Sequence, residues 1–238
     1  MAFFRSRYGR AFQRRVAKAR GDHRAWWTNE DYVREAAPGR SVVDVGGMWK
    51  IDGEYSFVAE AAGATDVTCL DMYATDEFHR KLKERTSKVK LVLGDAMVDS
   101  TIAEVGVVDL VMCFGVLYHV PDPARLIEAL SRMCRDKLIL ETFTTPEVPG
   151  VPQAGVYLPY QSASVRRRYD TARSGGTAGL AIGSDFDPER GYANNFWALS
   201  PSCISALLRS YGFRVTHVGP SPSGRLRHIF LADRLPAS

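Results

Sequence analysis

Three apolar segments that each end in an aspartate constrain the fold of this chain more than any other feature. The segments end at Asp44, Asp71 and Asp95, and helix-length intervals separate them. Alternation of this kind predicts parallel strands whose carboxyl ends share one crevice, at the switch point of a doubly wound sheet. The three aspartates are therefore expected along one edge of the sheet.

The turn after the first strand indicates a ligand site. Gly46 and Gly47 follow Asp44 almost at once, so the buried strand turns sharply at its end. At the next strand end, the carboxylate of Asp71 suits a ribose diol because it can accept hydrogen bonds from both hydroxyls. Asp95 can accept a hydrogen bond from an adenine amino group. This layout predicts a nucleoside site.

A nicotinamide dinucleotide uses the same architecture, but the Gly-x-Gly-x-x-Gly turn that it needs is absent. A pyrophosphate would meet Met48 and Trp49 in place of bare backbone. A sulfonium cofactor has no phosphates, and Asp44 supplies negative charge near a cation. Residues 44–50 resemble the first motif of the class I S-adenosylmethionine-dependent methyltransferases, which is an acidic residue, an apolar residue and a glycine-rich turn. The chain departs from that motif at Met48 and Lys50, where family members commonly carry further glycines.

The resemblance implies S-adenosylmethionine as the cofactor and S-adenosylhomocysteine as the product. Together with the strand pattern, it places the cofactor contacts at the ends of the first four strands. The expected contacts are Asp44, Gly46, Gly47, Trp49, Asp71, Met72, Asp95, Ala96, Cys113 and Phe114.

The order of elements defines the expected fold class. Residues 41–140 alternate between strand and helix, which implies a parallel sheet with right-handed crossovers. A final helix from residue 200 and two closing strands, 213–218 and 226–232, follow. We therefore expect an α/β protein with a Rossmann-like, seven-stranded methyltransferase sheet. Its last strand is antiparallel, helices cover both faces, helices precede the sheet, and a cap insertion follows the fifth strand.

Length and composition fit one domain divided into four parts. The chain has 238 residues, of which 45% are hydrophobic and 24% charged, as in ordinary globular proteins. The expected parts are N-terminal basic helices (1–39), a cofactor-binding core (40–143), a substrate cap (144–199), and a closing helix with strands (200–238).

Partners and location follow from charge and from the apolar runs. A net charge of +4 does not by itself indicate a nucleic-acid partner, and no apolar run is long enough for a membrane span. The four cysteines show neither metal nor redox spacing, so we expect a reduced, cytoplasmic protein with no metal. The oligomeric state stays open.

The N-terminal segment is strongly basic. Residues 1–24 carry eight basic side chains and one acidic one, with an apolar stripe at helical spacing. This segment is expected to form a helix that packs on the body of the protein, or that contacts tRNA or a membrane surface. It could instead bind a partner helix, act as a lid, or be an organelle transit peptide. Thr28 and Asp31 then form a capping box for a second helix. Trp26 and Trp27, just before it, pack on the sheet edge or cover the cofactor.

A second informative segment follows the fourth strand. Residues 115–123 read Gly-Val-Leu-Tyr-His-Val-Pro-Asp-Pro, and a well-marked helix begins after Asp122. This places Tyr118 and His119 on a loop above the sheet. His119 is the best candidate for a base because its unperturbed pKa suits work near neutrality, with Tyr118 beside it. The alternative is that His119 only bonds loop backbone or cofactor.

This segment and residues 138–142 resemble the branch of methyltransferases related to the tRNA wobble-uridine carboxymethyl-transferring enzymes. Those enzymes have a long N-terminal extension that this sequence lacks. They also place an arginine for a carboxylated cofactor where Asn194 stands here. The resemblance therefore implies ordinary S-adenosylmethionine.

The insertion after the fifth strand must lie over the crevice, so we expect it to select the substrate. The basic triplet at residues 166–168 is either a clamp for an anion or a solvated helix face. The acids at 185, 187 and 189 have metal-like spacing but are common in loops. Expected substrate contacts are Trp26, Trp27, Tyr157, Tyr160, Arg168, Asn195 and Trp197.

Several acceptor types are disfavoured. Amide and exocyclic-amine methylases often carry Asn/Asp-Pro-Pro-aromatic after the fourth strand, and this chain does not. Cys113 lacks the proline neighbour of cytosine-C5 enzymes. The favoured function is methyl transfer to a hydroxyl or carboxyl oxygen of a small molecule in a biosynthetic pathway, and a free amine stays open as acceptor. The alternatives are a tRNA-modifying methyltransferase, a non-catalytic cofactor-binding protein and, more distantly, a nicotinamide oxidoreductase.

Overall fold

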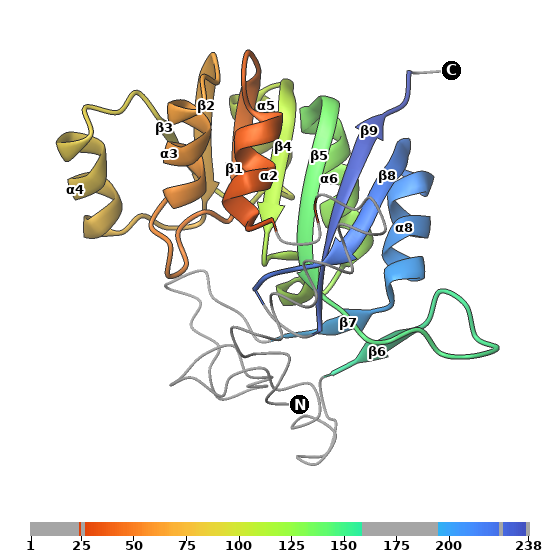
Figure 1. Cartoon of the computed structure of the whole chain (residues 1–238). Helices are drawn as coiled ribbons and strands as arrows, with labels where there is room; N and C mark the ends of the chain where they lie inside the picture. Colours follow the sequence, from red (N-terminus) through yellow and green to blue (C-terminus); the bar gives the residue numbers. More distant parts are fainter. Residues whose placement is uncertain (1–23, 25–26, 159–194, 224–225, 237–238) are drawn as a thin grey trace, which may run out of the picture.

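The described part of the chain is a seven-stranded sheet with helices on both faces (Figure 1). This computed structural model describes Arg24 and residues 27–158, 195–223 and 226–236. Its helices are α2 (Asn29–Ala36), α3 (Glu54–Ala61), α4 (Asp76–Glu84), α5 (Asp99–Val105), η2 (Leu117–His119), α6 (Pro123–Met133) and α8 (Pro201–Ser210). Its strands are β1 (Ser41–Val45), β2 (Asp66–Asp71), β3 (Lys90–Leu93), β4 (Val108–Phe114), β5 (Cys134–Phe143), β6 (Gly155–Tyr157), β7 (Trp197–Leu199), β8 (Phe213–Pro220) and β9 (Arg227–Arg234).

Strand order confirms the predicted sheet. The order is β3-β2-β1-β4-β5-β9-β8, and β1 to β5 run parallel. Only β9 is antiparallel to its neighbours β5 and β8. Register places Val45 opposite both Leu70 and Cys113, so β1, β2 and β4 end at the same edge. This carboxyl edge is where the sequence predicts the ligand site.

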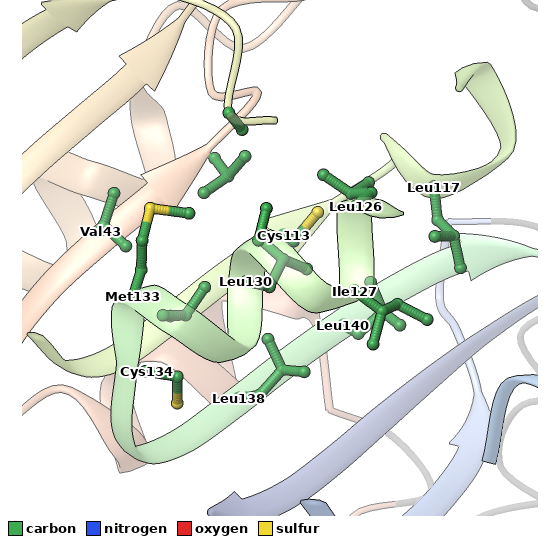
Figure 2. Close-up of a cluster of buried hydrophobic side chains, with 14 of the residues drawn as sticks. Val43, Cys113, Leu117, Leu126, Ile127, Leu130, Met133, Cys134, Leu138 and Leu140 are labelled. Carbon is green, nitrogen blue, oxygen red and sulfur yellow. The ribbon is translucent and has the colours of Figure 1, made fainter. Parts of the chain in front are cut away.

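The core has two layers because successive strand residues point to opposite faces. On one face, Val42 and Phe78 belong to the cluster beneath α2, α3 and α4. On the other, Val43 and Leu130 belong to the cluster beneath α5, α6 and α8. Figure 2 shows Val43, Leu130 and Met133 of the second cluster between the sheet and α6.

Helix boundaries follow the capping residues that the sequence indicates. The Thr28 hydroxyl accepts from the Asp31 amide, and the Asp31 carboxylate accepts from the Thr28 amide, which completes the capping box. Asp122 caps α6, which has proline in its first turn. Ser200 caps α8 in the same way.

The described ends of the insertion pair with each other. β6 and β7 form a small antiparallel sheet, and Thr144 bridges Leu199. The sequence did not indicate these three-residue strands, which are too short to show a period. The predicted helix in residues 1–24 lies outside the described residues apart from Arg24, and so do Trp26, Tyr160, Arg168, the triplet 166–168 and the acids at 185–189. Within the described ranges, no helix is long and apolar enough to cross a membrane.

Candidate functional site

The turn after β1 is built from close backbone contacts. Gly46 adopts φ +79°, and its N–H donates to the Leu70 carbonyl at 2.8 Å. A β-carbon on Gly46 would collide with the side chain of Val116. A β-carbon on Gly47 would lie 2.8 Å from both the Asp44 carboxylate and the Cys69 sulfur. Both glycines are therefore required by space, and they leave backbone in place of side chains at the tip of β1.

Asp44 lies beneath this turn as a buried carboxyl group. It is 1% exposed, and its Oδ2 accepts a hydrogen bond from the Ser56 hydroxyl at 2.8 Å. Burial raises the pKa of Asp44 to about 7, which outweighs the opposing effect of the Ser56 hydrogen bond. The group therefore changes charge near neutral pH, directly below the glycine turn.

This shift predicts how stability depends on pH. An unfolded aspartate titrates near ~3.9, so from about pH 4 to 7 the folded protein keeps a proton that the unfolded chain has lost. This contribution to the free energy of unfolding is full below pH 4, falls as pH rises, and is lost above about 7. The Asp44→Asn variant lacks this contribution. Its free energy of unfolding minus that of the parent, measured by urea unfolding, should therefore rise by about 1 kcal/mol or more from pH 5 to pH 8. The same difference between variant and parent at both pH values would contradict the prediction.

The carboxylate at the end of β2 faces the same turn. Asp71 Oδ2 accepts from the Met48 amide at 2.9 Å, and Oδ1 accepts from the Met72 amide at 2.7 Å. Burial raises the pKa of Asp71, although backbone hydrogen bonds oppose the shift. Asp71 therefore also fixes the path of the loop after β1. The side chain of Trp49 is half-buried, and that of Met72 is exposed.

The end of β3 follows the same pattern. Asp95 Oδ1 accepts from the Met97 amide at 2.8 Å, and the neighbouring Gly94 amide donates to the Asp71 carbonyl at 2.9 Å. Ala96 is buried beside it. The structure therefore brings the predicted residues of β1, β2 and β3 to one edge.

Cys113, which the sequence analysis expects as a cofactor contact, lies near the end of β4 with its side chain in the core. Its side chain is fully buried in the core cluster between β4 and α6, next to Leu126 and Leu130 (Figure 2). Burial raises the pKa of the Cys113 thiol far above its usual value, outside the range of a reactive cysteine, so its side chain serves packing. Its neighbour Phe114 points to the opposite face, where its ring lies 4.6 Å from that of Tyr55.

Tyr118 and His119 lie on the turn η2 after β4, as predicted. The ring centroids of the two residues are 4.1 Å apart. Tyr118 is buried, and its hydroxyl accepts a hydrogen bond from Arg227 Nη1 at 3.0 Å. His119 is half-buried.

A buried ion pair next to Tyr118 was not found from the sequence. Arg227 of β9 donates to both oxygens of Glu141 at the end of β5, each at 2.6 Å. Glu141 is 1% exposed and also accepts from the Ser221 hydroxyl at 2.7 Å. The one available signal was a glutamate inside the otherwise apolar fifth strand, since charged residues are rarely fully buried without a partner.

The described C-terminal end of the insertion reaches this turn, and the N-terminal end pairs with it through β6 and β7. The Phe196 amide donates to the Tyr118 carbonyl at 2.7 Å, and the Trp197 indole donates to the Pro121 carbonyl at 3.0 Å. The rings of Tyr157 and Trp197 lie 4.8 Å apart. Of the predicted substrate contacts, Asn195 and Trp197 flank Phe196, which bonds to Tyr118, and Tyr157 lies against Trp197. Trp27 packs separately against Tyr32 on α2, with ring centroids 5.0 Å apart.

The turn after β1 contains a third glycine, Gly53, which was not predicted from the sequence to belong to it. Gly53 has φ +74° and immediately precedes α3, and its amide donates to the Gly47 carbonyl at 2.8 Å. A β-carbon there would collide with the ring of Phe78. The turn after β1 therefore has glycines at both ends, and the last of them stands at the start of α3. Among the described residues, no group of three potential ligands could hold a metal ion.

Comparisons with known proteins agree with this architecture. Residues 51–140 match the family described as a methyltransferase domain. Magnesium protoporphyrin IX methyltransferase from Synechocystis PCC 6803, solved with S-adenosylhomocysteine, is 21% identical with a TM-score of 0.57, covering 86% of this chain and 81% of that one. A second structure, 1,6-didemethyltoxoflavin-N1-methyltransferase from Burkholderia thailandensis, is 16% identical with a TM-score of 0.55, and the match covers 96% of this chain and 89% of that one. Comparison with curated proteins gave no match.

The matched domain and the fold agree with each other. At these identities the solved structures show the fold, which is the Rossmann-like fold of methyltransferases. The domain match begins at residue 51, near the end of the turn after β1, covers β2, β3 and β4, and ends in β5. Together they support the class that the sequence predicts, a class I S-adenosylmethionine-dependent methyltransferase.

Proposed function

We propose that the protein transfers a methyl group from S-adenosylmethionine to an oxygen of a small molecule and releases S-adenosylhomocysteine. The observation that carries the proposal is the pairing of the Gly46–Gly47 turn with the Asp71 carboxylate on the carboxyl edge. The proposal also assigns a role to each residue at this edge and favours one kind of acceptor.

The residues at this edge fit the cofactor. Gly46 and Gly47 leave backbone where any side chain would fill the space above Asp44. Asp71 and Asp95, at the ends of adjacent strands, supply acceptors for ribose hydroxyls and an adenine amine. Met48 stands where a pyrophosphate would need bare backbone, and it is fully buried. When bound, S-adenosylmethionine supplies an activated methyl group.

The chain's own contribution to the reaction is alignment and proton removal. A displacement at a methyl group needs the nucleophile held in line in a dry site. Tyr118 is fixed by its hydrogen bond from Arg227, and the adjacent His119 is the base that takes the acceptor's proton. Phe196 and Trp197 attach the described C-terminal end of the insertion to the same turn, beside the place where we expect the acceptor.

A small molecule is favoured as acceptor by the position of the cap. Tyr157 and Trp197 offer aromatic surface beside Tyr118, as suits a planar or partly apolar compound. The structural relatives include enzymes named for small molecules, a porphyrin and a toxoflavin precursor. The tRNA-modifying alternative depends mainly on residues 1–24 and stays a prediction.

Calorimetric titration with S-adenosylhomocysteine, S-adenosylmethionine and NAD tests the cofactor. We expect both sulfur nucleosides to bind and NAD not to bind. Asp71→Asn should weaken S-adenosylhomocysteine binding by about 10- to 100-fold, because a charge-assisted hydrogen bond is worth roughly 1.5–3 kcal/mol.

The matched control for this titration lies on the same strand. Asp66 begins β2 at the opposite edge and pairs with Lys90 on the surface, so Asp66→Asn should leave the affinity unchanged. The cofactor assignment is wrong if the parent protein binds neither sulfur nucleoside, or if NAD binds better.

A further inference from the structure

The turn between β1 and α3 holds an unusual backbone shape. Lys50 and Asp52, neither of them glycine, have φ of +62° and +49°. This left-handed conformation costs about 1–2 kcal/mol for a residue with a β-carbon. Such a conformation persists only where the surrounding structure enforces it. The contacts that enforce it here are therefore part of how the turn is made.

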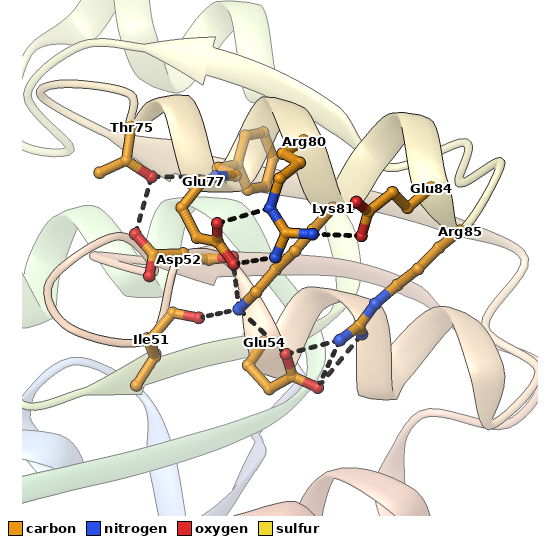
Figure 3. A network of polar contacts seen from close by, with 10 residues as sticks. Ile51, Asp52, Glu54, Thr75, Glu77, Arg80, Lys81, Glu84 and Arg85 are labelled. Atoms are coloured by element: carbon orange, nitrogen blue, oxygen red, sulfur yellow. Dashed lines mark hydrogen bonds and ion pairs between the residues drawn. The ribbon is translucent and has the colours of Figure 1, made fainter.

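Most of these contacts come from α4. The ammonium of Lys81 donates to the Ile51 carbonyl at 2.9 Å, reaches the Asp52 carbonyl at 3.5 Å, and lies 3.2 Å from the Glu54 carboxylate (Figure 3). It thus bridges three consecutive parts of the turn. The Lys81 side chain is only 16% exposed, so these contacts are shielded from water far more than a surface pair.

Other residues of the same helix support the bridge. The Thr75 hydroxyl donates to Asp52 Oδ1 at 2.7 Å while it caps α4 (Figure 3). Arg85 donates to both oxygens of Glu54. Burial raises the pKa of Glu54, but hydrogen bonds from Arg85 and Lys81 outweigh it and bring the pKa below its usual value.

The packing side of α4 completes the arrangement. Phe78 is fully buried, and its ring occupies the space where a β-carbon of Gly53 would lie. With the turn in this shape, the Asp52 amide donates to the Met48 carbonyl at 3.0 Å, and the Gly53 amide donates to the Gly47 carbonyl at 2.8 Å. The turn is therefore fixed to β1 on one side and to α4 on the other.

We propose that Lys81 is a positioning residue for the cofactor: it holds the turn between Gly46 and Gly53 in its binding shape, in place of the glycines that the first motif lacks. This inference rests on the proposed function, since it assigns a partner to the same turn. A flexible glycine turn would adopt the shape on binding. This chain instead fixes it in advance through a lysine 28 positions after Gly53, on another helix.

The first measurement is the affinity for S-adenosylhomocysteine of Lys81→Met and Lys81→Arg. Methionine keeps the apolar stem and removes the donor, so the binding shape should fall to about a tenth of the population and the apparent Kd should rise about tenfold. Arginine restores a cationic donor and should recover part of the loss. The matched control is Arg80→Met on the same helix. Arg80 is exposed and pairs only with Glu77 and Glu84 in the described structure, so its variant should bind like the parent.

The second measurement is amide hydrogen exchange without ligand. In Lys81→Met the amides of Asp52 and Gly53 should exchange faster, by about tenfold on the same reasoning, while those of the strands keep their protection. Unchanged affinity in folded Lys81→Met would overturn the proposal, as would uniform loss of protection across the whole sheet. If the parent protein does not bind S-adenosylhomocysteine, the proposed function fails instead, and the exchange result still shows whether Lys81 holds the turn.

Discussion

Arg227→Met is expected to lower the free energy of unfolding by about 3–5 kcal/mol, because it leaves the Glu141 carboxylate buried without its cation. The variant also removes the hydrogen bond to the Tyr118 hydroxyl. Urea unfolding near neutral pH, followed by circular dichroism, measures the difference.

Two further variants isolate the cause of this effect. The double variant Glu141→Gln with Arg227→Met removes both charges and should recover much of the lost stability. Arg132→Met removes an arginine from a surface pair, with Asp99 at 84% exposure, and should cost about 0–1 kcal/mol. A double variant that is no more stable than Arg227→Met would contradict the assignment to an unpaired charge.

Gly46→Ala is expected to lower the free energy of unfolding by about 2–5 kcal/mol and to reduce S-adenosylhomocysteine binding at least ~100-fold. The new methyl group would meet the Val116 side chain, and the residue would also have to keep its left-handed φ. Because the turn ends β1 directly at the proposed site, a shift to relieve the collision would move the backbone that the cofactor contacts. Calorimetry and urea unfolding provide the two measurements.

Gly39→Ala is the matched control for that prediction. Gly39 has a similar φ of +72°, but no atom lies within 4 Å of the position that its β-carbon would take. It should therefore show only the backbone cost, about 1–2 kcal/mol, with unchanged affinity. If the two variants behave alike, the collision with Val116 is not what makes Gly46 necessary.

Local patterns in the sequence were sufficient for most of the fold. The β-branched run before Gly46 and the pairing of Thr28 with Asp31 act through neighbours within a few residues, so they can be recognised without tertiary contacts. The seven-stranded sheet followed from the order of such elements. The same patterns placed Asp44 and Asp71 at one edge, because parallel strands align their carboxyl ends.

What could not be predicted depends on contacts between distant positions. Glu141 and Arg227 are 86 residues apart, and nothing local to either indicates the other. Lys81 reads as one of many charged residues on a surface helix until its distance to the Ile51 carbonyl is known. No prediction was made for Gly53, because its close contact with Phe78 joins positions 25 residues apart. Strand position placed Cys113 near the end of β4 but could not decide which face its side chain occupies.

The position of β9 between β5 and β8 also determines how the sheet is assembled. β8 precedes β9 in the chain, yet β9 is its only strand neighbour in the described sheet. A short connection joins the two strands, so they can form a hairpin before either meets the remainder. Docking of that hairpin onto β5 brings Arg227 to Glu141 at the moment the sheet closes. Closure by a strand that lacks a basic residue opposite Phe143 would bury the Glu141 carboxylate without a cation, and is therefore disfavoured.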